Sequence, residues 1–129
     1  MTHINITSYD SRYWGGNITF MFVQDIARVG LTDKESKIYL TSLRIGPASM
    51  QVLARKAGID RGTAYHVAQT LRSKDLFMVA QEGARPMFRA AHPQELYNYM
   101  QARKEEADRH FSALQEMYDD LVALYEVGD

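Results

Sequence analysis

Cysteine is absent from the 129 residues of this chain, which excludes disulfides, thiolate metal ligands and catalytic cysteines. Long apolar runs are missing too, because no stretch approaches the roughly 20 residues that a membrane-spanning helix needs. The first residues also lack the basic-then-apolar order of a secretion signal. We therefore expect a cytoplasmic chain that makes no membrane contact. Its length suits one ordinary domain with an appendage.

Net charge is also small, at −1, but the average hides a division along the chain. Residues 44–89 contain eight basic and three acidic side chains, a balance of +5, whereas residues 90–129 contain three basic and nine acidic ones, a balance of −6. Positive charge gathered in one segment is typical of contact with phosphates. The middle of the chain, and not its tail, is therefore the part expected to meet nucleic acid.

Residue patterns that support catalysis or metal binding are also lacking. The histidines His3, His66, His92 and His110 are scattered, and neither a Ser/His/Asp set nor a glycine-rich phosphate loop is present. Glu106 and His110 are i,i+4 neighbours on a charged helix face, where a surface contact is the ordinary outcome. We expect no enzyme activity, no cofactor and no metal.

The stretch 59–74 predicts an amphipathic helix around which the middle of the chain is organised. Its apolar positions recur at i, i+3, i+4 and i+7 and so form one buried stripe. The other side carries hydrogen-bonding tips that suit the reading of DNA bases. The buried stripe is Ala64, Val67, Ala68 and Leu71, and the polar side is Arg61, Thr63, Tyr65, His66, Gln69, Thr70, Arg72 and Ser73.

A second, shorter helix precedes this one, with Ser49 as its expected N-cap and Gly58 as the left-handed residue that ends it. Asp60 is placed to cap the next helix. Helix, short glycine-containing turn and helix make a helix-turn-helix. After it, two strand-like runs (76–80 and 87–91) flank a connector with Gly83 and Pro86, which predicts a hairpin. The predicted fold is mainly α with a small β-hairpin, a winged helix-turn-helix.

From this fold and charge distribution we expect a DNA-binding transcriptional regulator, with the second helix in the major groove and the hairpin wing on the phosphate backbone. The alternative is a winged helix that contacts only proteins, although such a surface would present apolar anchors instead of basic residues. The expected DNA-binding residues are Arg61, Thr63, Tyr65, His66, Gln69, Thr70, Arg72 and Lys74 of the helix and Arg85 and Arg89 of the wing.

Upstream of the helix-turn-helix, Thr32 and Glu35 form a capping box that starts a helix over 33–45. Its residues Ile38, Tyr39, Leu40 and Leu43 are expected to pack inward. A short lead-in helix is expected over 22–29, ended by Gly30. Residues 1–20 are read either as a hairpin turning at Gly15-Gly16 or as a flexible leader. The domain is therefore placed at 21–92.

Four blocks in order resemble the DNA-binding domain of the TrmB-like family of prokaryotic transcriptional regulators: GLTDKESKIYL (30–40), GPAS (46–49), AGIDRGTAY (57–65) and LRSKDL (71–76). The resemblance covers about residues 23–93, and the ordered run is more specific than any one block. It implies a winged helix-turn-helix that binds double-stranded operator DNA as a dimer.

Three departures from the family pattern limit this resemblance. Asp60 stands where the family commonly has proline, and Asp75 stands where glycine is usual at a helix end; aspartate tolerates left-handed geometry better than most residues. Longer relatives carry a C-terminal sugar-binding domain, whereas this chain stops 38 residues after Ala91. No sugar-binding domain is therefore expected here.

The final segment, 93–129, predicts one helix of about 50 Å from Gln94 to about Val127. Apolar residues recur every seven positions along it, and such a stripe is typical of a helix that packs against a partner helix. This pattern predicts a homodimer joined by a coiled coil, either parallel or antiparallel. The alternative is that the stripe folds back on its own domain. The expected dimerisation residues are Met100, Ala107, Phe111, Leu114, Met117, Tyr118, Leu121 and Leu124.

Overall fold

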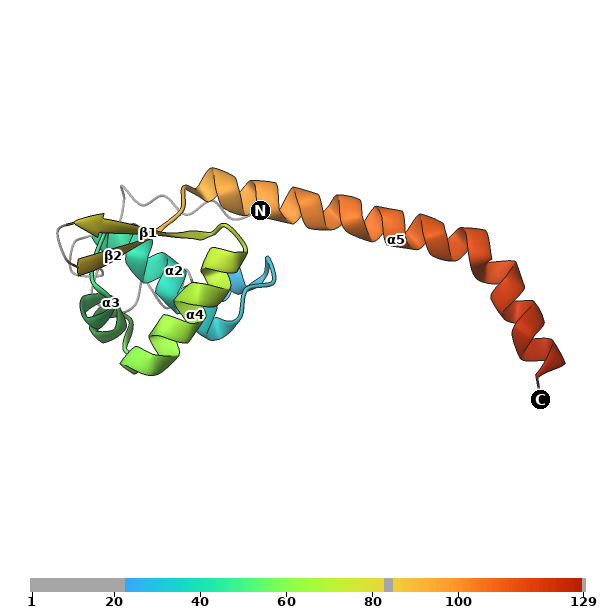
Figure 1. Cartoon of the computed structure of the whole chain (residues 1–129), viewed down its shortest axis with the longest axis horizontal. Coiled ribbons are helices and arrows are strands. Elements are labelled where there is room, and N and C mark those ends of the chain that lie inside the picture. The colour runs from blue at the N-terminus through green and yellow to red at the C-terminus, as the bar shows by residue number, and fades with distance from the viewer. Residues whose placement is uncertain (1–22, 83–84, 129) are drawn as a thin grey trace. The chain divides into compact units, whose positions relative to one another are not determined.

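The computed structural model describes residues 23–82 and 85–128 (Figure 1). The chain divides after His92 into two compact units. The first unit contains residues 23–27, which are helical, then α2 (Asp33–Ile45), α3 (Met50–Ala57), α4 (Arg61–Ser73), β1 (Phe77–Glu82) and β2 (Arg85–Ala90); the second is α5 (Pro93–Val127). The alternatives proposed for residues 1–20 lie outside the described residues.

The start of α2 has the capping box that the sequence predicts. The Thr32 hydroxyl accepts a hydrogen bond from the Glu35 amide at 3.1 Å, and the Glu35 carboxylate accepts one from the Thr32 amide at 2.9 Å. These two bonds satisfy amides that have no partner within the helix. At the other end, Gly46 adopts a positive φ of 79° and ends the helix.

The inward face of α2 differs from the one expected. Ile38 and Tyr39 are buried as predicted, but Leu40 is half-buried and Leu43 is 42% exposed. The predicted burial of Leu43 is therefore wrong. Glu35 and Ser42 are buried instead, because they lie at i and i+7 of the stripe that contains Ile38 and Tyr39. A polar residue can occupy such a stripe when its hydrogen bonds are made inside the protein.

The helix-turn-helix is built as its sequence predicts. The Ser49 hydroxyl caps α3 by accepting from the Val52 amide, and Gly58 adopts the left-handed conformation with φ 72° and ψ 32°. The Asp60 carboxylate then accepts from the Thr63 amide at 3.0 Å and starts α4. After α4, Asp75 has a positive φ of 60°, the left-handed geometry that aspartate tolerates.

The hairpin is longer than the sequence indicates. The strands were expected to stop at residue 80 and resume at 87, yet antiparallel pairing continues through Gln81 with Pro86 and Glu82 with Arg85. Pro86 is tolerated because a hairpin strand has an edge on which no amide is needed. Ala48, just before α3, also exchanges two backbone hydrogen bonds with Phe88, which ties the wing to the helix-turn-helix.

Two side chains of α2 form hydrogen bonds with the backbone at the end of the wing. The Ser42 hydroxyl accepts from the Ala90 amide at 2.7 Å, and the Tyr39 hydroxyl donates to the Ala91 carbonyl at 3.3 Å. Burial raises the pKa of Tyr39, so this hydroxyl stays protonated and able to donate. The result is a winged helix whose core is completed by Leu53, Ala64, Val67, Ala68, Leu71, Leu76, Phe77 and Phe88.

Candidate nucleic-acid interface

Helix α4 presents two sharply different faces. Ala64, Val67, Ala68 and Leu71 are all buried, as their spacing predicts, and they fix the rotation of the helix in the domain. The face opposite this stripe follows the ridge Gly62, His66, Gln69 and Ser73 at i, i+4, i+7 and i+11. Of the predicted reading residues on α4, Arg61, Tyr65, His66 and Arg72 are exposed, and Thr63, Gln69 and Thr70 are half-buried.

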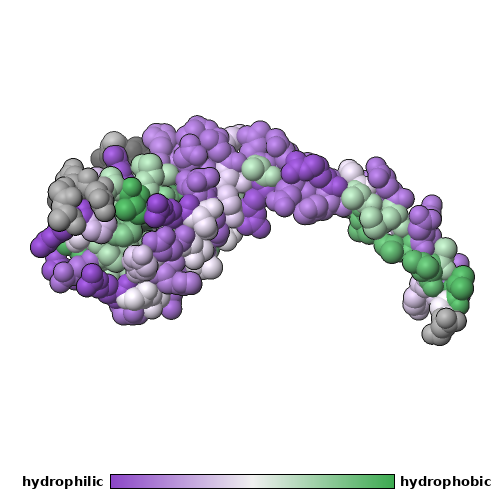
Figure 2. All heavy atoms as spheres, in the orientation of Figure 1, coloured by the Kyte–Doolittle hydropathy of each residue, from purple (hydrophilic) through white to green (hydrophobic). Residues whose placement is uncertain are grey.

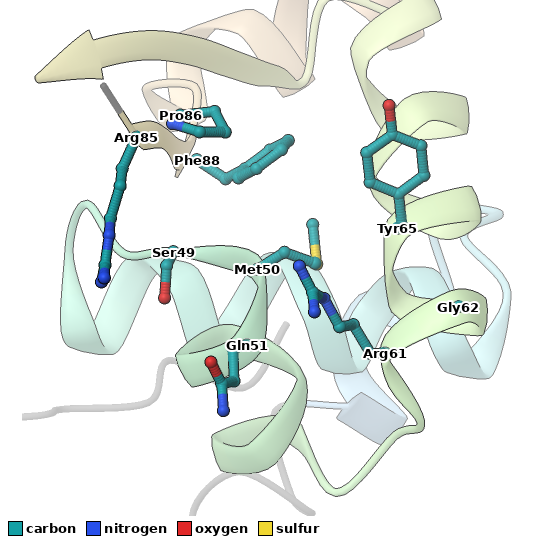
Figure 3. Close-up of a pocket in the computed structure, with 9 residues that line it drawn as sticks. All are labelled: Ser49, Met50, Gln51, Arg61, Gly62, Tyr65, Arg85, Pro86 and Phe88. Carbon is teal, nitrogen blue, oxygen red and sulfur yellow. The ribbon is translucent and has the colours of Figure 1, made fainter. Parts of the chain in front are cut away.

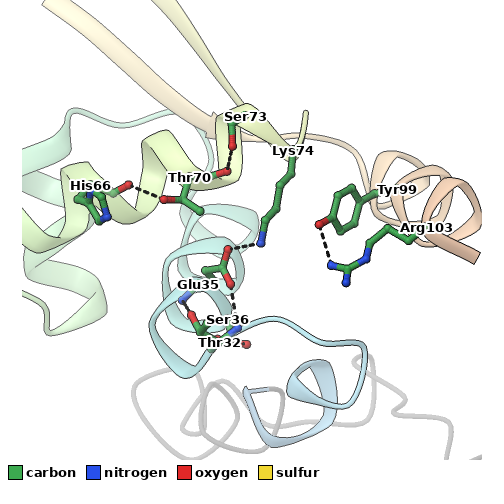
Figure 4. Close-up of polar contacts among 9 residues, drawn as sticks. All are labelled: Thr32, Glu35, Ser36, His66, Thr70, Ser73, Lys74, Tyr99 and Arg103. Carbon is green, nitrogen blue, oxygen red and sulfur yellow. Dashed lines mark hydrogen bonds and ion pairs between the residues drawn. The ribbon is translucent and has the colours of Figure 1, made fainter. Parts of the chain in front are cut away.

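Two side-chain hydroxyls on α4 donate hydrogen bonds to backbone carbonyls of the same helix. Thr70 donates to the His66 carbonyl at 3.2 Å, and Ser73 donates to the Thr70 carbonyl at 2.6 Å (Figure 4). Their protons are therefore engaged, whereas their oxygens can still accept. Gln69 keeps both a donor and an acceptor on its side chain, which makes it the better candidate for pairing with a base edge.

The start of α4 carries a charged cap. Hydrogen bonding from Thr63 holds the pKa of Asp60 below its usual range, so this cap is ionised at neutral pH. Negative charge at a helix N-terminus is stabilising because the free amides there carry partial positive charge. The aspartate that replaces the family's usual proline therefore still defines where the reading helix begins.

A cavity of about 560 Å³ lies between the first turn of α3, the first turns of α4 and the wing. Figure 3 shows Phe88 and Pro86 on one side of Met50, with Arg61 reaching from α4 toward Met50 and Arg85 on the far side of the cavity. The Tyr65 ring meets the Phe88 ring edge-on, with centroids 6.3 Å apart. The structure thus brings together Arg61, Tyr65 and Arg85, which the sequence nominated separately.

Lys74, in contrast, is directed into the protein. Its ammonium lies 2.8 Å from a carboxylate oxygen of Glu35, whose side chain is only 5% exposed (Figure 4). Burial alone would raise the pKa of Glu35, but hydrogen bonds from Lys74 and Thr32 outweigh it and leave that pKa below its usual value. This ion pair joins the start of α2 to the end of α4, which gives Lys74 a structural partner besides any phosphate.

The two arginines of the wing lie near opposite ends of β2. Side chains alternate along a strand, and Phe88 and Ala90 of β2 face the core. Arg89 is exposed, pairs with Met78 of β1 and therefore lies on the opposite face of the hairpin from Phe88. Arg85 lines the cavity at the open end of the strand. The structure therefore places Arg85, but not Arg89, on the cavity that the reading helix also borders.

Six residues that line this cavity were not named among the expected contacts: Ser49, Met50, Gln51, Gly62, Pro86 and Phe88. The cap pattern already located Ser49, so its neighbour Gln51 could have been placed beside the first turn of α4. Gly62 has a Cβ position that meets only the Asp60 carboxylate, at 3.5 Å. Packing therefore does not require glycine there, and the missing side chain leaves the helix start open to a ligand.

The second unit, α5, has no buried residue along its 35 positions. Arg103 donates to the Tyr99 hydroxyl at 3.0 Å one turn away, a local contact within this helix (Figure 4). Figure 2 shows hydrophobic residues gathered over the last part of the helix. The exposed apolar side chains there are Phe111, Leu114, Met117, Tyr118, Leu121, Leu124, Tyr125 and Val127. Met117 and Leu124 belong to a seven-residue series, and in the first part of the helix the same series is occupied by Arg103 and His110. We call the face formed by these heptad positions the seam.

A capped helix-turn-helix followed by a hairpin that packs on it defines the winged-helix class. The family description "Sugar-specific transcriptional regulator TrmB" matches residues 26–94, which is more than half of the chain. The chain therefore belongs to the TrmB family of transcriptional regulators. No curated protein matches it.

Solved structures confirm the winged-helix fold. The chain is similar to TrmBL2, an archaeal chromatin protein described as having a novel mode of DNA binding, with a TM-score of 0.71 and 19% identity over 86% of this chain and 43% of that one. The chain thus spans less than half the length of TrmBL2. A possible transcriptional regulator from Methanosarcina mazei Go1 gives a TM-score of 0.58 and 17% identity over 75% of this chain and 87% of that one.

A third structure, the transcriptional regulator Tm0710 from Thermotoga maritima, gives a TM-score of 0.51 and 14% identity over 85% of this chain and 83% of that one. At these identities the structures establish the fold alone. Within residues 23–82 and 85–128, no helix is long and apolar enough to cross a membrane.

Proposed function

We propose that this chain is a sequence-specific DNA-binding regulator that places α4 in the major groove of duplex DNA and the wing on the phosphate backbone. One observation supports this proposal most directly. The exposed face of α4 continues into the cavity that Arg61 and Arg85 line. Family membership supports it, as does the gathering of positive charge in residues 44–89. Such a regulator acts at the chromosome, which in a prokaryote means the cytoplasm.

The roles within this surface follow from chemistry and position. Gln69 and His66 lie on the ridge opposite the buried stripe, where side chains can reach base edges, and an amide can bond two atoms of adenine. Thr63, Tyr65, Thr70 and Arg72 flank that ridge and complete the proposed reading face. Arg85 is placed for the backbone, and phosphate contacts fix register without reading sequence. Lys74 and Arg89 remain proposed phosphate contacts.

Fluorescence anisotropy with labelled duplexes tests the proposal. An operator is first selected from a randomised duplex pool, and binding of operator and random DNA is then measured between about 50 and 200 mM salt. If six phosphates are neutralised, affinity should fall by about 10³ over that range. Binding that is absent, or that ignores salt, would favour the alternative of a protein-contact module.

Substitutions separate reading from backbone contact. Gln69→Ala should reduce the preference for operator over random DNA by about 1–3 kcal/mol, whereas Arg85→Ala should weaken both duplexes alike. Arg109→Ala is the matched control, because it removes the same charge from the acidic segment of α5. Equal losses on both duplexes from Gln69→Ala would contradict the reading role.

We further propose that the chain is a homodimer joined through α5. In the single chain Leu114 and Leu121 remain 47% and 44% exposed, and Leu124 is 70% exposed. A contiguous apolar stripe of this kind is unusual on a monomer, and its seven-residue repeat suits a second helix. Met100 and Ala107 extend the same seam, but Arg103 and His110 interrupt its apolar character. The pairing is therefore proposed mainly for residues 111–125.

Sedimentation analysis of matched double variants tests this pairing. Leu114→Asp with Leu121→Asp places two carboxylates in the seam, where an unpaired buried charge costs several kcal/mol, so this variant should be a folded monomer. Ser112→Asp with Ala123→Asp adds the same charge on the opposite side of the helix and should remain a dimer. A wild-type monomer at micromolar concentration would refute the pairing.

A further inference from the structure

The cavity between α3, α4 and the wing has an apolar interior. Binding of DNA phosphates alone would not need such an interior. Met50, Pro86 and Phe88 line it together with the ring of Tyr65, and the crossed Tyr65 and Phe88 rings supply aromatic surface. Its volume of about 560 Å³ falls in the range of small-molecule sites, which are mostly apolar with a few polar groups that fix orientation.

The rim of this cavity is cationic. Arg61 and Arg85 line it from different elements, and Figure 3 shows them on opposite sides of Met50. Gln51 borders it from the first turn of α3 and Gly62 from the first turn of α4. None of the nine described residues that line the cavity is acidic. The ionised Asp60 carboxylate caps α4 next to Gly62, so the charge that favours an anion here comes from the two arginines.

We propose that this cavity binds a small planar organic anion, of the class of aromatic carboxylates, and that its occupancy excludes DNA. The ring would lie against Tyr65 and Phe88, while the carboxylate would take the bidentate donors of Arg61 and Arg85. The exclusion of DNA rests on the proposed function, because both ligands then require the same arginines. Binding of the small anion itself does not depend on that function.

Calorimetry on the full chain tests the site directly with three probes. The probe 2-naphthoate supplies both ring and charge, 2-naphthamide supplies the ring without charge, and acetate supplies the charge without the ring. Naphthoate should bind one per chain and at least about tenfold more tightly than naphthamide, since an added charge-assisted hydrogen bond is worth about that factor. Acetate should not bind at the same concentrations.

Variants place the probe in this cavity. Arg61→Gln and Arg85→Gln should each weaken naphthoate by about tenfold, whereas Arg55→Gln, on the exposed last turn of α3 and outside the cavity, should not. Tyr65 is 51% exposed, so it can be replaced without opening the core. Tyr65→Ala should weaken naphthoate and Tyr65→Phe should retain it.

The DNA measurement is a separate arm. Naphthoate should raise the apparent Kd of the wild-type chain for duplex DNA, and it should have no such effect on the Arg85→Gln variant at the same concentration. Naphthoate binding with this variant pattern in a chain that binds no DNA would support the site and refute the proposed function. Absence of naphthoate binding in a chain that does bind DNA would overturn the proposed site and leave the proposed function intact. Equal affinity for naphthoate and naphthamide, or an unchanged naphthoate affinity in the Arg61→Gln variant, would also overturn the site.

Discussion

Replacing Glu35 with glutamine tests the ion pair that joins α2 to the end of the reading helix. The substitution keeps the size of the side chain and an oxygen that can accept from the Thr32 amide, but it removes the charge that Lys74 meets at 2.8 Å. A hydrogen bond to a charged group contributes about 1.5–3 kcal/mol. Because the Lys74 side chain is 24% exposed and partly solvated, we expect the lower part of that range.

Thermal unfolding converts this expectation into a measurement. For a domain of this size, each kcal/mol shifts Tm by about 4–8 °C, so Glu35→Gln should lower the Tm of the winged unit by about 6–16 °C at neutral pH. The double variant with Lys74→Met gives the coupling energy of the pair, because each single change removes the same interaction. A coupling energy near zero would mean that the pair does not stabilise the fold.

The pH dependence supplies an independent check. Since the hydrogen bonds from Lys74 and Thr32 hold the pKa of Glu35 in the folded protein below its usual value, the charged pair stabilises the fold above the unfolded pKa and loses its effect as pH falls through the folded pKa. The difference in Tm between wild type and Glu35→Gln should therefore be full at pH 7 and shrink below about pH 4. A difference that stays constant down to pH 3 would refute the assignment to this carboxylate.

Five further substitutions, at four positions, have defined outcomes. Gly62→Ala should raise stability by up to about 0.5–1 kcal/mol, because its Cβ meets only ordinary contact, while anisotropy should show weaker DNA binding as the new methyl holds the backbone away. Asp75→Gly should raise Tm, since Asp75 has φ 60°, whereas Asp75→Val should lower it. Ser42→Ala leaves the buried Ala90 amide unpaired and should cost about 1–3 kcal/mol; Thr41→Val removes a buried hydroxyl that has no partner among the described residues and should be neutral or stabilising.

The local geometry of the helix starts was predictable because it depends on neighbours in sequence. Thr32 with Glu35 and Asp60 with Thr63 each span three residues, and the hydrogen bonds form as their spacing requires. The buried stripe of α4 followed from the same kind of local periodicity. Each of these predictions needed only the geometry of one helical turn.

Contacts between distant segments were not predictable in this way. Ser42 bonds the Ala90 amide 48 residues away, and Lys74 meets Glu35 across 39 residues. Read alone, Ser42 is a polar residue of a type that favours the surface, whereas the apolar Leu43 is predicted to pack inward. Only the packing of the wing on α2 shows that a serine is needed there to satisfy a strand amide.

In the candidate site, too, the local features were predictable and the contacts between distant segments were not. Arg61 and Arg85 were predicted as contacts from their charge, but nothing in their spacing indicated that they would border one cavity on opposite sides of Met50. The cavity exists because the backbone of Phe88 bonds that of Ala48 at 2.8 and 3.1 Å and draws the wing toward the first turn of α3. That bridge has no counterpart in local sequence patterns, since it joins Ala48, in the segment before α3, to Phe88, which lies within β2.

The distribution of apolar residues along α5 bears on how a dimer would meet DNA. The strongly apolar seam begins at Phe111, whereas Arg103 and His110 occupy the equivalent positions nearer the winged unit. A coiled coil held only by the distal half leaves the proximal half solvated, because charged seam positions weaken pairing there. The separation of two reading helices would then be set by an unpaired stretch of helix. On this basis we expect the dimer to tolerate operators whose half-sites differ in spacing by a few base pairs, and Arg103→Leu with His110→Leu, which extends the seam, should narrow that tolerance.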